Sequence, residues 1–177
     1  LLQILGTIET YTKKESSRLF LNNHDISLMN DDELANFRNQ EIGFVFQFHQ
    51  LLPEFTAVEN ICIPAFINKV PKKIAETKAK ELMDYLGIIK KKNNKPNELS
   101  GGEKQRIAVA RSLINDPSII LADEPSGNLD TSSSNNLHDL FLDLRKDFNC
   151  TFIIATHDLL LAKKSDRVLE ITDGKIK

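Results

Sequence analysis

The 177-residue sequence lacks features that would point to several classes of protein. Its formal net charge of −2 at pH 7 leaves no basic excess of the kind that nucleic-acid-binding surfaces carry. No uninterrupted apolar run approaches the length of a membrane span, and the first residues lack the basic and hydrophobic regions of a secretory signal. We therefore expect no nucleic-acid partner and expect any role at a membrane to depend on partners.

Cysteine is also scarce. Cys62 and Cys150 lie far apart in apolar contexts and match no metal-binding or redox spacing. We expect reduced thiols in the core of a cytosolic protein. The length and composition suit a single globular domain, and no internal repeat is evident.

The chain lacks the glycine-rich loop that commonly binds nucleotide phosphates. No G-x-x-x-x-G-K-[ST] occurs, and the Gly174-Lys175 pair is followed by Ile176. A different glycine pair is present. Ser100, Gly101, Gly102 and Glu103 open a predicted helix, in which Ser100 and Glu103 form a capping box that needs no ligand. Because the two glycines leave backbone N–H groups bare at the positive end of the helix dipole, we favour anion binding here.

An apolar strand follows this helix. Residues Ser118 to Ala122 suit a sheet that is buried on both faces, and Asp123 and Glu124 come directly after them. Charges at this position lie at the carboxyl edge of the sheet, where ligands of open α/β sheets bind. Asp123 is a candidate Mg²⁺ ligand, and Glu124 can orient or deprotonate an attacking water. The alternative is two solvated carboxylates at the entry of a loop.

Two further polar residues follow predicted strands. Gln47 comes after the strand 42–46, and His157 comes after the strand 151–155. In a parallel sheet both would lie at the same edge as Asp123. The Gln47 amide could then reach a metal or the attacking water, and His157 could hydrogen-bond a phosphate or that water. Each residue taken alone is more typical of an ordinary loop.

Together these segments resemble the nucleotide-binding subunits of ABC transporters. The string LSGGEKQR resembles the signature motif of that family, IILADEP the Walker B segment and SGNLD the D-loop. Gln47 resembles the Q-loop glutamine, and His157 the switch histidine. Five motifs occur in the family's order, and the resemblance runs from the first residue to the last.

The resemblance implies an α/β fold, with a P-loop NTPase-type layered core, a mainly parallel sheet and a small helical subdomain. Residues 1–177 would form one ABC-type ATPase domain. Segments 1–46 and 117–177 would make the α/β core, and 47–116 would contain the Q-loop, helical subdomain and signature helix. Because the family's P-loop precedes a helix like Leu1–Leu5, we expect the chain to be an N-terminally truncated fragment that is inactive alone. A non-catalytic regulatory module is the alternative.

The resemblance also implies ATP and Mg²⁺ as cofactors. Two subunits would face each other head to tail as a homodimer, with the signature motif of one gripping the γ-phosphate held by the other. The residues implied to contact the nucleotide are Ser100, Gly101, Gly102 and Asp130. Those implied in catalysis are Glu124, His157 and Gln47, and those implied at the metal are Asp123 and Gln47.

The loop Phe48–Phe55 is unusually apolar, so it must fold back on the core or cover a partner. In the family a short helix of the membrane subunit docks there. The strings QFHQLLPEFTAVENI, ELSGGEKQRIAVARSL and LADEPSGNLD are most similar to the ATPase of the bacterial lipoprotein-releasing transporter. That likeness implies peripheral attachment to the cytoplasmic face of the inner membrane. MacB-like exporters and FtsE-like cell-division subunits remain alternatives, whereas the short interval from Gln47 to Ser100 argues against a coiled-coil DNA-repair ATPase.

Periodicity and turn residues predict the remaining elements. The expected helices are Leu1–Leu5, Asp31–Gln40, Thr56 to about Phe66, Lys72–Leu86 and an amphipathic helix through Leu137 and Phe148. The expected strands are Arg18–Asn22 and Arg167–Ile171, the latter closing a hairpin at Asp173-Gly174. The Tyr11–Ser17 stretch lacks the glycine-containing turn of the family, which leaves its loop shape open.

Overall fold

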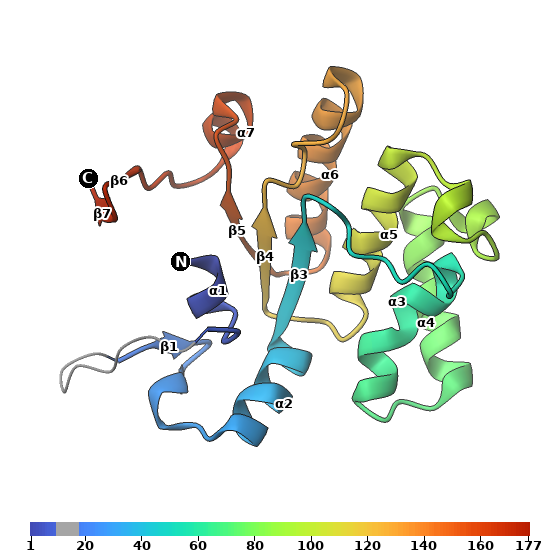
Figure 1. Cartoon of the computed structure of the whole chain (residues 1–177), viewed down its shortest axis with the longest axis horizontal. Helices are drawn as coiled ribbons and strands as arrows, with labels where there is room; N and C mark the ends of the chain where they lie inside the picture. The colour runs from blue at the N-terminus through green and yellow to red at the C-terminus, as the bar shows by residue number, and fades with distance from the viewer. Residues whose placement is uncertain (10–17) are drawn as a thin grey trace.

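The structure is a computed structural model that describes residues 1–9 and 18–177 (Figure 1). The Tyr11–Ser17 stretch lies outside the described residues. At the centre is a parallel sheet in the order β3-β4-β5, comprising β3 (Ile42–Phe46), β4 (Ile119–Asp123) and β5 (Thr151–Ala155). The register pairs Phe46 with Asp123 and Asp123 with Ala155, so the three strands end level. The expected α/β fold with a mainly parallel sheet is confirmed.

Each face of the sheet is covered by different elements. One face packs against α5 (Gly101–Leu113) and α6 (Thr131–Asp147) through alternate apolar residues of the strands, namely Val45, Ile120, Ala122, Phe152 and Ile154. The opposite face packs against α1 (Leu2–Leu5) and α2 (Asp31–Glu41) through Ile42, Phe44, Ile119, Leu121 and Ile153. This alternation follows from the two-residue period of a strand.

A helical subdomain lies to one side of the sheet. Helices α3 (Ala57–Ile67) and α4 (Lys72–Tyr85) stand beside α5, on the side away from α1 (Figure 1). The α3 helix begins at a Thr56–Glu59 capping box, and α4 is followed by Gly87 with φ of +69°, as its turn requires. The described part of the chain before β4 also contains three short 3₁₀ helices, at Ile26–Leu28, Ile89–Lys91 and Pro96–Glu98.

Two predicted strands need correction. The Arg18–Asn22 strand is reduced to β1 (Phe20–Leu21), which pairs antiparallel with β2 (His24–Asp25). Asn22 belongs to the turn instead, because it and Asn23 take left-handed backbone angles, which asparagine tolerates.

The end of the chain forms a hairpin that is shorter than expected. The hairpin at Asp173-Gly174 is confirmed, but its strands are β6 (Ile171–Thr172) and β7 (Lys175–Ile176). The prediction was wrong for residues 167–170, which form no strand because no described strand pairs with them. The short helix α7 (Leu159–Lys164) was not predicted.

Both cysteines are buried and free, as expected. Burial raises the pKa of the Cys62 thiol to about 11. Within residues 1–9 and 18–177, no helix combines the length and apolarity needed to traverse a bilayer.

Candidate functional site

The carboxyl edge of the sheet brings Glu124 and His157 into contact. Glu124 Oε1 accepts a hydrogen bond from the His157 backbone N at 3.0 Å and lies 2.8 Å from Nδ1 of the same residue. The Thr156 hydroxyl donates to the other carboxylate oxygen, Oε2, at 3.1 Å. Both oxygens of Glu124 are therefore held by the loop that leaves β5.

The backbone at Glu124 is strained. Its φ of 41° lies in the left-handed region, which costs a non-glycine residue on the order of 1–3 kcal/mol. The Glu124 N–H donates to the Ala155 carbonyl at 2.9 Å, which extends the β4–β5 pairing by one bond. Such strain persists only where neighbouring bonds hold the residue, and it concentrates at functional sites.

The charge of Glu124 acts on His157. A hydrogen bond from the imidazole to the Glu124 carboxylate, reinforced by its negative charge, raises the pKa of His157. The His157 side chain is 87% exposed. Because Nδ1 faces Glu124, Nε2 is the ring nitrogen left to meet a ligand.

Asp123 and Gln47 lie on neighbouring strand ends. The Asp123 carboxylate is exposed, and Phe46 is its register partner, so Gln47 comes directly beside this pair. The Gln47 amide Nε2 donates to Asn128 Oδ1 at 3.3 Å, and Asn128 Nδ2 donates to the Gln47 carbonyl at 3.1 Å. The amide oxygen of Gln47 makes no hydrogen bond to a described residue, so it remains open to a ligand.

This donor set suits Mg²⁺ only with help from a ligand. One carboxylate and one amide oxygen match the preference of Mg²⁺ for few protein oxygens completed by phosphate oxygens and water. Among the residues the structure describes, no cluster of three His, Cys, Asp or Glu side chains could hold a metal alone. The residues present therefore fit a metal that arrives with a nucleotide, and the metal assignment stays a prediction.

The signature residues form a second group, at the start of α5. Ser100 is the N-cap, and its hydroxyl accepts from the Glu103 N–H at 3.3 Å. Ser100 and Gly101 are exposed, and a Cβ on Gly101 would lie 3.8 Å from Leu129 Cδ2. A Cβ on Gly102 would likewise lie 3.9 Å from Ser133 Oγ. The helix start thus lies beside Leu129 of the D-loop segment and Ser133 of α6 in its own chain.

Asp130 has a structural role in this group. It caps α6 by accepting from Ser133 N at 3.0 Å and Ser133 Oγ at 2.6 Å. These hydrogen bonds lower the pKa of Asp130. No hydrogen bond or ion pair between described residues joins the Ser100–Gly102 segment to Glu124 or His157. The predicted site residues therefore fall into two separate groups.

Side chains of α5 and α3 hydrogen-bond the backbone of the Phe48–Phe55 loop. Arg111 donates from Nη1 to the Gln50 carbonyl at 2.7 Å and from Nη2 to the His49 carbonyl at 2.8 Å. The buried Asn60 side chain accepts from Leu52 N at 2.8 Å and donates to the carbonyls of Leu52 and Phe55, each at 3.1 Å. Three apolar side chains nevertheless stay exposed, namely Phe48 (74%), Leu52 (43%) and Phe55 (41%).

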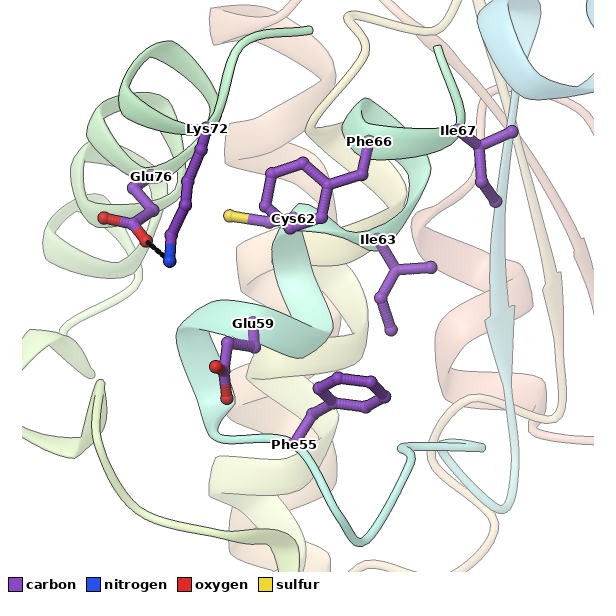
Figure 2. Close-up of a pocket in the computed structure, with 8 residues that line it drawn as sticks. All are labelled: Phe55, Glu59, Cys62, Ile63, Phe66, Ile67, Lys72 and Glu76. Carbon is purple, nitrogen blue, oxygen red and sulfur yellow. Dashed lines mark ion pairs between the residues drawn. The ribbon is translucent and has the colours of Figure 1, made fainter. Parts of the chain in front are cut away.

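A pocket of about 420 Å³ adjoins this loop. Figure 2 shows Phe55 from the loop facing Ile63 and Phe66 of α3, with the Lys72–Glu76 ion pair of α4 at the rim. The full lining is Phe55, Glu59, Cys62, Ile63, Phe66, Ile67, Lys72 and Glu76. Sequence reasoning missed the α3 part of this surface. The sequence feature that could have revealed it is that α3 is apolar on nearly every side, because such a helix must be covered on more than one face.

Comparisons with known proteins agree on one family. The ABC transporter family model matches residues 3–127. The lipoprotein-releasing system ATP-binding protein LolD of Bacteroides fragilis is 54% identical over 176 residues, covering 99% of this chain and 80% of the relative. LolD of Cytophaga hutchinsonii is also 54% identical, covering 99% and 79%. The dimeric ATP-binding cassette MJ0796 in a post-hydrolysis state bound to ADP and Pi superposes with a TM-score of 0.85 at 32% identity, covering 99% of this chain and 76% of that one.

Proposed function

This chain belongs to the ABC transporter family, and on that premise we propose that it is the ATP-hydrolysing subunit of a lipoprotein-releasing transporter. The 54% identity to LolD proteins over nearly the whole chain supports this specialisation. The subunit would be one ATPase domain, with residues 47–116 contributing the Q-loop, helical subdomain and signature helix. It would work peripherally at the cytoplasmic face of the bacterial inner membrane.

The observation that carries the proposal is the Glu124–His157 contact at the carboxyl edge of the sheet. Glu124 would act as the general base on the attacking water, a role worth about 10²–10⁴-fold in rate. The 2.8 Å contact to Nδ1 holds the imidazole against the carboxylate, which directs Nε2 of His157 to the γ-phosphate or the water. The raised pKa of His157 favours a protonated ring facing that phosphate.

ATP would bind with Mg²⁺. The Asp123 carboxylate and the Gln47 amide oxygen are the residues that would hold the metal. Bound there, Mg²⁺ would neutralise charge on the phosphates. Asn128 would fix the Gln47 amide so that its oxygen, and not its nitrogen, faces the metal.

A second copy would complete the site. Ser100, Gly101, Gly102 and Asp130 lie apart from Glu124 in their own chain, which supports a head-to-tail homodimer in which they contact the partner's nucleotide. The bare N–H groups at the start of α5 and the positive end of its dipole suit a γ-phosphate. The dimeric state of the similar MJ0796 cassette supports an assembly of two subunits.

The membrane partner would dock on the Phe48–Phe55 loop and the adjoining pocket. An amphipathic helix that lays its apolar side into a groove is a common recognition mode, and Phe55, Ile63 and Phe66 supply the apolar floor (Figure 2). Arg111 and Asn60 hold the loop in shape without a partner, so little ordering cost would remain on docking.

The test is Glu124→Gln in the full-length subunit. The amide keeps the shape of the side chain but cannot accept a proton from water. We expect phosphate release to fall by about 10²-fold or more, and the variant to sediment as a dimer in saturating ATP and Mg²⁺. Glu81→Gln, at an exposed position on α4, is the matched control and should behave as wild type. A Glu124→Gln subunit that still hydrolyses ATP, or that stays monomeric with ATP, would contradict the proposal.

A further inference from the structure

The histidine at position 138 is buried between the two loops that carry the proposed catalytic pair. It lies on α6 and is 0% exposed. Its Nε2 lies 3.3 Å from Ser126 Oγ and 3.6 Å from Asp158 Oδ2. Its Nδ1 is buried and has no hydrogen-bond partner among the described residues.

The two neighbours of the ring belong to different segments. Ser126 follows Glu124 by two residues, and Asp158 comes directly after His157. The Asp158 N–H donates to Thr156 Oγ1 at 3.0 Å, and the Thr156 hydroxyl donates in turn to Glu124 Oε2 at 3.1 Å. The ring therefore closes a connection that joins the end of β4 to the end of β5.

The surroundings of the ring select one protonation state. Burial, together with the positive charge of Lys164, lowers the pKa of His138 more than Asp158 and Asp139 raise it, so the ring is neutral at physiological pH. A neutral imidazole has a single N–H. Because the Asp158 carboxylate is anionic and faces Nε2, the proton belongs on Nε2. From there it can be donated to Ser126 Oγ at 3.3 Å, while the Asp158 carboxylate at 3.6 Å is an electrostatic neighbour.

We propose that His138 is a positioning residue for ATP hydrolysis, whose buried ring ties the segment after Glu124 to the segment carrying His157. The inference rests on the proposed function. His138 does not reach the reacting atoms and acts only by keeping the side chain of His157 in its position against Glu124. Loss of this connection should slow the chemical step more than it weakens nucleotide binding, because the N–H groups at the start of α5 that are proposed to bind the γ-phosphate lie elsewhere.

Two substitutions separate the hydrogen bond from the packing. His138→Leu fills a similar volume without a donor, and His138→Gln keeps an amide donor near the position of Nε2. We expect His138→Leu to lower kcat about 10-fold, as small misplacements of catalytic groups do. The KM for ATP should stay within about twofold, and His138→Gln should restore most of kcat. If the leucine variant does not fold, His138→Asn, which is too short to bridge both partners, takes its place with the same expected loss.

The control lies one residue away. Asp139 forms an exposed ion pair with Lys164, 2.6 Å long, which joins α6 to α7 without touching the loop at 156–158. Asp139→Asn should leave kcat unchanged, because exposed pairs contribute little. If Asp139→Asn slows hydrolysis as much as His138→Leu, the effect is general loosening and the proposal is overturned. Wild-type kcat in the leucine or asparagine variant would overturn it too.

A second readout does not depend on activity. Amide hydrogen exchange of segment 155–161, measured by mass spectrometry on the full chain, should rise about 10-fold in His138→Leu but not in His138→Gln or Asp139→Asn. Unchanged exchange in His138→Leu would overturn the tie. A wild-type full-length subunit that hydrolyses no ATP would refute the proposed function, while the exchange measurement would still decide whether His138 holds the two loops together.

Discussion

Gly43 and Gly101 allow the packing of the fold and the proposed chemistry to be tested by the same perturbation, a single added methyl group. On Gly43, in β3, a Cβ would lie 2.4 Å from the Ser112 carbonyl oxygen and 3.0 Å from Ser112 Cβ. On Gly101, at the start of α5, the nearest atom would be Leu129 Cδ2 at 3.8 Å, an ordinary contact. The same methyl is thus excluded at one position and accommodated at the other.

These distances set the expected magnitudes. Overpacking a core costs about 1–3 kcal/mol, and we expect the upper end for Gly43→Ala because the clash is with the backbone of α5, which cannot rotate away. A loss of about 3 kcal/mol lowers Tm by roughly 6–12 °C in a chain of this size. Gly101→Ala should instead leave the free energy of unfolding unchanged or raise it by at most about 1 kcal/mol, since alanine is the better helix former.

Thermal unfolding followed by circular dichroism, and phosphate release at 25 °C, complete the test on the full-length subunit. Gly43→Ala should unfold at lower temperature yet keep its turnover per folded molecule. Gly101→Ala should keep its Tm and lose turnover by about 10-fold or more, because the methyl obstructs the approach of a phosphate to the bare N–H groups. Wild-type turnover in Gly101→Ala would refute the proposed phosphate contact, and a wild-type Tm in Gly43→Ala would refute the packing of β3 on α5.

Glu124, Asn60 and Cys62 make contacts that can each be tested separately. Glu124→Gln should lower the pKa of His157 in an NMR titration, because the hydrogen-bond acceptor loses its charge. In the wild type, the stability that the Glu124–His157 pair contributes is present below pH about 6.5 and should be lost as the pH rises through the raised pKa of His157. An unchanged pKa of His157 in the variant would contradict the pairing. Asn60→Ala should reduce the free energy of unfolding by about 1–3 kcal/mol, measured by urea denaturation, because it leaves the Leu52 N–H without its acceptor, and wild-type stability would count against this role. Cys62 should resist alkylation at pH 8 until the chain unfolds, because it is buried and its pKa is about 11; rapid labelling of the folded protein would contradict its burial.

Local sequence patterns are enough to predict most helices and strands and the edge of the sheet where the site residues lie. Capping residues at Thr56 and Ser100 mark where α3 and α5 begin, because a cap acts within one turn of the helix. The apolar runs of β3, β4 and β5 predict a buried parallel sheet, and polar residues that follow such strands necessarily share its carboxyl edge. The proximity of Glu124 and His157 could therefore be expected from their places after two strands.

Contacts between side chains that are far apart in sequence could not be predicted, because they depend on the packing of the whole fold. Asn128 pairs with Gln47 from 81 residues away, and the ring of His138 reaches loops that leave two different strands. The pocket beside Phe55 needs the relative placement of a loop and two helices. The strand expected at Arg167–Ile171 was wrong over residues 167–170 for the same reason, since a strand exists only where a neighbouring strand pairs with it. Local propensity acts over a few residues, whereas these contacts depend on how the whole chain packs.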